Sequence, residues 1–149
     1  MNELFVPYKE SLELKELGFN EPTFYHWHNS CKTHPFTNEI FNPNCRPKTN
    51  SGIKEIGEEN HVWSAPIFSQ AFNFFREKYN SHHSITRLPQ GALDADSKNN
   101  KVLKKYAWFV SKDDLNPTIP NDGSGKCDTY EEAELECLRK LIEICKSIN

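Results

Sequence analysis

The sequence lacks most of the signals that would place a chain in a membrane or name an enzyme class. It has no run of about 18 apolar residues, so no segment suits a membrane-spanning helix. Its first residues, MNELFVPYKE, lack a basic stretch followed by an apolar one, and we expect no signal peptide. A Walker loop, a dinucleotide-binding fingerprint, an HExxH motif and a CxxC pair are all missing. These absences predict a protein that stays in the cytosol where it is made.

Basic residues are not in excess either. The 18 Lys and Arg stand against 21 Asp and Glu, which gives a net charge of −3 and a pI near 6.1. Proteins that bind the phosphate backbone without regard to sequence usually carry a pronounced basic excess. We therefore expect no general nucleic-acid binding, and a local basic patch remains open as an alternative.

Aliphatic side chains are scarce, but aromatic ones are not. Hydrophobic residues make up 36 % of the 149 positions, and ten Phe, five Tyr and three Trp bring the aromatic share to 12 %. This length predicts a single domain, residues 1–149, whose core consists of few but large side chains. The five cysteines are odd in number, and without an export signal we expect free thiols. Cys137 and Cys145 fit a helical pattern as small buried groups.

Two helices are predicted in the first half of the chain. Pro7–Leu17 begins at a proline that suits a first turn. It ends at Gly18, which tolerates a left-handed backbone and lets Phe19 fold back on the helix. The second helix is expected to start from a cap at Ser64 and to run to about Tyr79, with a phenylalanine every three or four residues.

The last helix, Thr129–Ser147, carries signals at both ends. Thr129 and Glu132 form a capping-box pair, and acidic residues precede basic ones along the helix, as the helix dipole favours. Its predicted apolar face consists of Ala133, Cys137, Leu138, Leu141, Ile144, Cys145 and Ile148. This face predicts a helix packed along one side of the domain.

Three strands complete the predicted fold. Alternation and aromatic content place them at Pro22–His28, near His83–Leu88 and at Val102–Ser111. Long irregular loops are expected at about 29–61 and 112–128. The order α-β-α-β-β-α predicts an α+β fold, with a small, mainly antiparallel sheet of about three strands packed with three helices.

A candidate binding surface follows from the third strand. Ala107 and Phe109 share one alternation phase with Leu103, whereas Tyr106 and Trp108 share the other. If the first phase faces the core, the second forms an aromatic and basic surface that can stack a base and neutralise a phosphate. The candidate ligand-binding residues are Tyr25, Trp27, His83, Arg87, Lys104, Tyr106 and Trp108. The alternative is that a helix covers this face too and that Tyr106 and Trp108 belong to the core.

A candidate metal cluster lies near the second predicted element. His26, His28, Cys31 and His34 carry imidazole and thiolate groups, the natural ligands of zinc. Their spacing matches no standard zinc finger or ribbon, and the alternative is a polar loop in which these residues occur together by chance. Nothing local supports a catalytic cysteine, because no strained turn or oxyanion-hole pattern accompanies one. We predict no catalytic residue and no cofactor.

Three segments resemble a family of small proteins. The segments are FVPYKESLELKELGFNEPTFYHW at 5–27, APIFSQAFNFFREKYNSHHSI at 65–85 and TYEEAELECLRKLIEI at 129–144, together about 40 % of the chain. They are similar to short uncharacterised proteins of Bacteroidota phages, prophages and mobile elements. The resemblance implies an accessory protein of a mobile element in a bacterial host cytosol, and it brings no catalytic motif or cofactor.

The predicted function is therefore binding. We expect a non-enzymatic accessory protein that sequesters a nucleotide-type small molecule or a host factor, in the manner of a counter-defence protein. The alternatives are a protein–protein interaction module that acts on a bacterial host protein, and a zinc-containing module or metal-dependent enzyme built on the histidine and cysteine cluster. No membrane partner is expected, and an oligomer is compatible with each of these functions.

Overall fold

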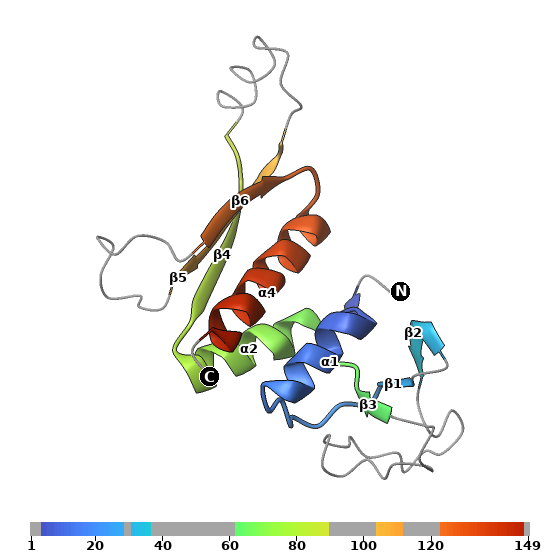
Figure 1. The fold of residues 1–149 in the computed structure, drawn as a ribbon. Helices are drawn as coiled ribbons and strands as arrows, with labels where there is room; N and C mark the ends of the chain where they lie inside the picture. The colour runs from blue at the N-terminus through green and yellow to red at the C-terminus, as the bar shows by residue number, and fades with distance from the viewer. Residues whose placement is uncertain (1–3, 29–30, 37–61, 90–103, 112–122, 148–149) are drawn as a thin grey trace. The chain divides into compact units, whose positions relative to one another are not determined.

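A computed structural model describes residues 4–28, 31–36, 62–89, 104–111 and 123–147 (Figure 1). These residues belong to two compact units, Met1–Asn73 and Phe74–Asn149, each with its own antiparallel three-stranded sheet. The predicted α+β class is confirmed, and the prediction of a single domain stays a prediction. Within the described ranges, no helix has the length and apolar character needed to cross a membrane.

The N-terminal unit contains one complete helix and the first sheet. Its elements are α1 (Tyr8–Glu16), β1 (His26–His28), β2 (Cys31–Phe36) and β3 (Val62–Ser64). The strand order is β2-β1-β3, and Trp27 pairs with Trp63 across β1 and β3. Strand β2 falls inside the loop predicted at about 29–61, so that prediction is wrong for these six residues, and β3 begins directly after the predicted loop. Backbone hydrogen bonds to β1 place them in the sheet without an apolar alternation of their own.

Helix α1 ends as its sequence predicts. Gly18 has a positive φ of 89°, the conformation that a residue without a Cβ adopts most easily. The Phe19 N–H donates to the Leu14 carbonyl and the Gly18 N–H donates to the Lys15 carbonyl, both at 2.9 Å. These two bonds define a Schellman motif, and they satisfy carbonyls that the helix end would otherwise leave unpaired.

The core of the N-terminal unit is built on tryptophans. Trp27 is 4 % exposed and Trp63 is 2 % exposed, and the Tyr8 ring packs edge-on against both, at 5.9 and 4.6 Å between centroids. The Trp27 indole N–H donates to the Val6 carbonyl at 3.1 Å and to the Ser11 hydroxyl oxygen at 3.0 Å. Trp27 therefore holds the start of α1 against β1 by packing and hydrogen bonding together.

Helix α2 (Phe68–Tyr79) starts later than predicted, and the prediction of a cap at Ser64 is wrong. Ser64 instead ends β3 opposite His26, and the Ala65 N–H donates to the Tyr25 carbonyl. The backbone groups of Ser64 and Ala65 therefore bond to the segment of β1, and they are not available for the first turn of a helix. The helix is buried on more than one side, since Phe68, Ala71, Phe72, Phe74 and Phe75 are all at most 8 % exposed.

The C-terminal unit contains the second sheet and the last helix. Its strands are β4 (His82–Arg87), β5 (Tyr106–Ser111) and β6 (Gly123–Cys127), and its helix is α4 (Tyr130–Lys146). The strands form an antiparallel meander in the order β4-β5-β6, and α4 lies across one face of it (Figure 1). Strand β6 falls inside the loop predicted at about 112–128, so that prediction is wrong for these five residues.

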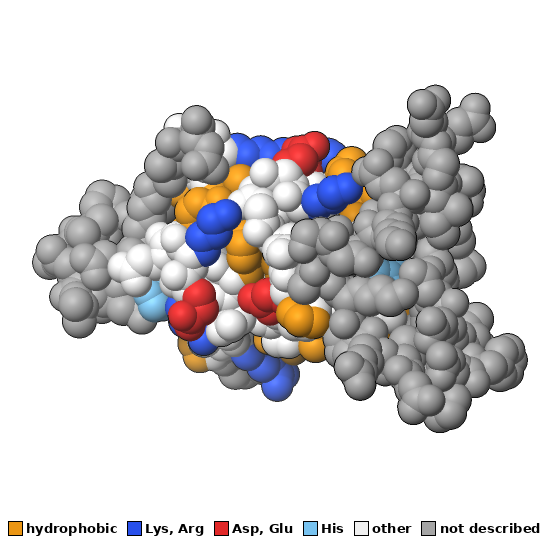
Figure 2. Space-filling view, turned by 90° about the horizontal axis from the view of Figure 1, so that it is seen from below, with side chains coloured by type: hydrophobic (Ala, Val, Ile, Leu, Met, Phe, Trp, Pro, Cys, Tyr) orange, Lys and Arg blue, Asp and Glu red, His pale blue; other side chains and the backbone are white. Residues whose placement is uncertain are grey.

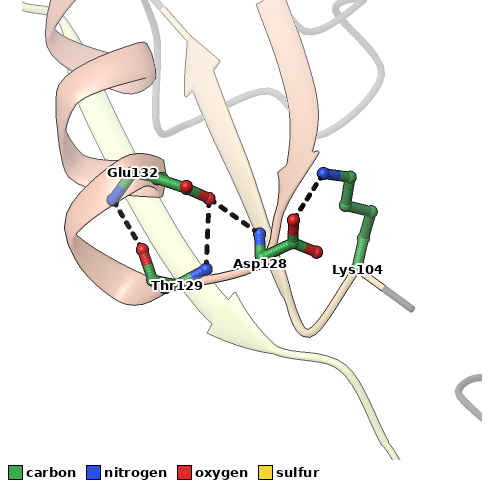
Figure 3. Close-up of polar contacts among 4 residues, drawn as sticks. All are labelled: Lys104, Asp128, Thr129 and Glu132. Carbon is green, nitrogen blue, oxygen red and sulfur yellow. Dashed lines mark hydrogen bonds and ion pairs between the residues drawn. The ribbon is translucent and has the colours of Figure 1, made fainter. Parts of the chain in front are cut away.

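The N-terminus of α4 confirms the predicted capping box. The Thr129 hydroxyl oxygen accepts from the Glu132 N–H at 3.1 Å, and the Glu132 carboxylate accepts from the N–H groups of Thr129 and Asp128 (Figure 3). Beside it, Lys104 Nζ and Asp128 Oδ2 form an ion pair at 2.9 Å. Side chains of the helix (Glu132) and of the residue that precedes β5 by two positions (Lys104) thus both bond to the junction between β6 and α4.

Replacing Thr129 by alanine is expected to lower the free energy of unfolding by about 1 kcal/mol, because the helix loses its N-cap acceptor. Thermal unfolding followed by circular dichroism measures the change. Thr86→Ala, at an exposed position of β4, is the matched control and should change stability by less than about 0.5 kcal/mol. Equal effects of the two substitutions would show that the cap contributes nothing.

The two faces of the second sheet differ in how far their side chains are exposed. Trp108 and Val110 of β5, with Cys127 of β6, are at most 8 % exposed on the face that α4 covers. Phe109 points the other way and is 37 % exposed, so the expectation that it faces the core is wrong. Ala107, in the same phase, is buried, at 4 % exposure. Both phases of β5 carry apolar residues, and alternation alone could not tell which one the helix would cover.

Gly125 allows the indole of Trp108 to lie across β6. A Cβ at position 125 would come within 2.6 Å of Trp108 Nε1 and 2.7 Å of Trp108 Cε2, closer than such atoms approach. Gly125→Ala is therefore expected to cost about 1–3 kcal/mol of unfolding free energy, as overpacked cores do. Urea denaturation of the purified variant gives this value.

Gly123 supplies the matched control on the same strand. The three atoms nearest to a Cβ there all belong to the side chain of Lys140, starting with Cγ at 2.6 Å, and this partly exposed side chain can make room by a change of rotamer. We expect Gly123→Ala to cost less than about 1 kcal/mol. If Gly125→Ala proved no more costly than Gly123→Ala, the packing of Trp108 on β6 would be refuted.

Candidate binding groove beside the last helix

A groove of about 410 Å³ runs between strand β6 and helix α4 in the C-terminal unit. The sheet contributes Trp108, Gly123 and Ser124, and the helix contributes Glu136, Arg139, Lys140 and Glu143. Helical spacing explains the second set, because residues three, four and seven apart share one side of a helix. The absence of a side chain at Gly123 leaves room for Lys140 to lie along the strand.

The charged residues of the helix wall form two ion pairs. Arg139 Nη1 lies 2.9 Å from Glu136 Oε1, and Lys140 Nζ lies 2.8 Å from Glu143 Oε1. Both pairs are three residues apart and largely exposed, except that Lys140 is half-buried. The two positive and two negative charges cancel. Exposed pairs of this kind contribute only about 0.3–0.5 kcal/mol, so a ligand can replace one partner at little cost.

The groove carries hydrogen-bonding groups of both charges. A guanidinium and an ammonium group present donors to an anionic group, and the neighbouring carboxylates can accept from hydroxyl or amino groups. Trp108, at 8 % exposure, provides an apolar floor. The volume of the groove falls in the range of small-molecule sites, which is about 300–1,000 Å³.

The structure distributes the predicted ligand-binding residues over both units. Tyr25, at 37 % exposure, and the buried Trp27 lie in the N-terminal unit. In the C-terminal unit, cross-strand pairing of Arg87 with Tyr106 places both side chains on the face that α4 covers. The Tyr106 ring contacts the Tyr130 ring at 6.0 Å. Trp108 is largely buried under α4, as the alternative interpretation expects, and its remaining exposed surface borders the groove.

Two further candidate ligand-binding residues, Lys104 and His83, have pKa values that their surroundings shift. Hydrogen bonding to Asp128 raises the pKa of Lys104 above its ordinary value, which keeps this lysine protonated in an ion pair. Burial lowers the pKa of His83, and the nearby positive charge of Arg76 and the ring of His82 lower it further. His83 is therefore neutral at physiological pH and is not a cation for a phosphate.

The described cysteines are structural, as predicted for Cys137 and Cys145. Cys127, Cys137 and Cys145 are free and at most 8 % exposed. Burial raises the pKa of the Cys137 thiol to about 12, and its Sγ donates to the Phe109 carbonyl at 3.8 Å. A thiol with this pKa stays protonated at neutral pH and is no nucleophile.

The candidate metal cluster lies mostly outside the described side chains. His26 is on β1 and is 3 % exposed, and the backbone of His28 pairs with that of Cys31 across β1 and β2. Among the described residues, no group of three histidine, cysteine or acidic side chains is arranged to hold a metal ion. The side chains of His28, Cys31 and His34 are not described, so the zinc site stays a prediction.

The groove could not be predicted from the sequence by the signals that were used. Glu136, Arg139, Lys140 and Glu143 have the spacing of a solvated helix face, and Gly123 lies in a stretch typical of loops. The useful signal would have been GSGKC, in which small residues alternate with polar ones just before a capped helix.

On the face shown in Figure 2, the described basic and acidic side chains are interspersed and form no patch of a single sign.

Comparisons with known proteins identify no relative of the chain. No protein-family model, curated protein or solved structure matches the chain. The functional inference is therefore based on the groove and on the chemistry of its residues.

Proposed function

We propose that the chain is a non-enzymatic binding protein, an accessory protein of a phage or other mobile element, that sequesters a nucleotide-type small molecule in the groove beside α4. The observation that carries the proposal is the position of Arg139 and Lys140 on one wall with Trp108 beneath them. A phosphate group matches the guanidinium donors of an arginine in geometry and charge. A base or sugar can pack on the apolar floor while the glutamates accept from its polar groups.

Thermal-shift measurements with mononucleotides and cyclic dinucleotides test this proposal. A ligand at 100 times its dissociation constant stabilises the folded chain by about 2.7 kcal/mol, which raises the melting temperature measurably. Arg139→Gln is expected to weaken binding by about tenfold or more, since it removes a charged hydrogen bond. Lys146→Gln, on the same helix but outside the groove, is the control and should leave binding unchanged.

The proposal fails if none of these ligands shifts the melting temperature at about 1 mM, far above the micromolar range of specific binding. It also fails if Arg139→Gln and Lys146→Gln bind a ligand equally well, because the ligand would then lie elsewhere.

A second candidate function, docking to a protein of the bacterial host, is favoured by an apolar cluster in the N-terminal unit. Leu4 is 64 % exposed, Phe24 54 %, Ile67 39 % and Tyr25 37 %. A β-bridge joins Phe5 to Ile67, and the Phe5 and Tyr25 rings are 4.7 Å apart, while Leu4 and Phe24 directly precede Phe5 and Tyr25 in the sequence. Exposed apolar clusters of this kind are typical of protein interfaces.

Affinity capture from bacterial lysate separates this function from the first. The wild-type chain should retain a defined host protein that Phe24→Ser, at the most exposed aromatic position of the cluster, loses. The groove variant Arg139→Gln should retain it fully. Recovery of no specific protein, or equal recovery by Phe24→Ser, would count against a docking function.

A further inference from the structure

The face of the second sheet that α4 does not cover presents an aromatic ring among polar groups. Phe109 lies on the central strand β5, in register with Ser84 of β4 on one side and Ser124 of β6 on the other. Phe109 is 37 % exposed and both serines are exposed. Ser124 also borders the groove because β6 is an edge strand, but the register places its side chain on the Phe109 face.

The charged side chains described on the strands of this face are basic, and Asp128, the first acidic residue after β6, forms an ion pair with Lys104. Lys126 of β6 lies in register with Ala107 beside Phe109, and it is exposed. Lys105 precedes β5 and is exposed, and its backbone extends the ladder through bonds with Leu88 and Cys127. The described residues of the three strands include no aspartate or glutamate. The acidic excess of the chain is therefore located elsewhere, and these strands are complementary to an anion.

We infer that this face, with Phe109 at its centre, binds single-stranded nucleic acid. An unpaired base can stack on the exposed ring of Phe109, and the two lysines can neutralise flanking phosphates. The serine hydroxyls on either side both donate and accept, so they can bond base edges. Duplexes are excluded from this mode because their bases are already stacked and paired. A protein partner fits poorly, because one aromatic ring among hydroxyls and lysines offers little apolar area.

The inference is compatible with the net charge of −3. Such a charge opposes general binding along a phosphate backbone, and it leaves room for a short strand held mainly by stacking. The face lies on the opposite side of the sheet from the helix wall of the groove. Failure of one site therefore does not imply failure of the other, and the variants that test them do not overlap.

Fluorescence anisotropy of the full chain with labelled DNA and RNA single strands of about ten nucleotides tests the inference, since one such surface spans about 4–16 nucleotides. Wild-type protein should bind a single strand at about 50 mM salt with micromolar affinity, and an unlabelled duplex should compete poorly. Phe109→Leu should weaken binding about fivefold or more, because stacking is lost, whereas Phe109→Tyr should retain it.

The salt dependence separates the lysine contact from a merely structural effect. Lys126→Gln should reduce the slope of log K against log salt by about 0.7, the value of one phosphate contact on a single strand. Lys146→Gln, on the helix that covers the other face, should leave this slope unchanged. Absence of binding up to about 100 µM protein at low salt would overturn the inference, since even non-specific binders associate below that concentration. Equal affinities of the Phe109→Leu and wild-type chains, or an unchanged slope for Lys126→Gln, would also overturn it.

Discussion

Replacing Trp27 by alanine is expected to lower the free energy of unfolding by about 3–5 kcal/mol, the range found when buried tryptophans are truncated. The indole is 4 % exposed and packs against Tyr8, so its removal leaves a cavity at the centre of the N-terminal unit. It also removes the donor that bridges the Val6 carbonyl and the Ser11 hydroxyl. Urea denaturation followed by near-ultraviolet circular dichroism measures the loss.

Two companion variants separate packing from hydrogen bonding. Trp27→Phe keeps a ring and removes the N–H, and it should cost about 1–3 kcal/mol, as for other buried hydrogen bonds left incomplete. Phe24→Ala, three residues earlier and 54 % exposed, should cost less than about 0.5 kcal/mol. A Trp27→Ala chain as stable as Phe24→Ala would contradict the core assignment of Trp27.

Leu138→Ala is expected to cost about 2–5 kcal/mol, the second large effect. Leu138 is 0 % exposed on the face of α4 that packs on the second sheet, between the buried residues Cys137 and Leu141. The cavity would lie between helix and sheet, where the surrounding backbone is held by the strand ladder and cannot collapse. Thermal unfolding followed by circular dichroism at 222 nm reports the change directly, because α4 is the longest helix described.

Leu135→Ala is the matched control for Leu138→Ala. It removes the same atoms from the same helix, at a position that is only half-buried. We expect a cost of at most about 1 kcal/mol, because little apolar area returns to water. If the two substitutions were equally costly, the assignment of the packed face of α4 would be wrong.

The last helix could be predicted almost residue for residue, since its signals are local. A capping box, an ordered charge gradient and an apolar stripe lie within the helix itself, and Thr129–Ser147 was predicted where α4 spans Tyr130–Lys146 between those two caps. The stripe was less accurate at its edge. Ile142 is buried and Ile144 only half-buried, because a small rotation of the helix on the sheet decides between neighbouring positions.

Short strands were missed where their stability comes from partners distant in sequence. Strand β6, GSGKC, contains two glycines and no aliphatic residue, so propensity favours a loop. Its place in the sheet is fixed by pairing with β5 and by Trp108, which occupies the space above Gly125. Similarly, β3 exists because β1 pairs with it, and this pairing moved the start of α2 from Ser64 to Phe68.

The candidate ligand-binding residues stay a prediction, and the sequence did not show which face of the second sheet the last helix covers. The sequence shows that Tyr106 and Trp108 share a face, and pairing with β4 confirms the neighbourhood of Arg87 and Tyr106. The sequence does not show that α4 covers the face of Tyr106 and Trp108. The groove and the open face both depend on this one packing choice, which buries Trp108 and exposes Phe109.

The most direct test of the proposed function is a titration of the isotopically labelled chain with nucleotides, followed by amide NMR signals. We predict saturable shifts confined to Gly123, Ser124 and the stretch of α4 from Glu136 to Glu143. These shifts should be lost in Arg139→Gln and kept in Lys146→Gln. The absence of shifts with every mononucleotide and cyclic dinucleotide at about 1 mM would contradict the proposal, as would saturable shifts located only outside the groove.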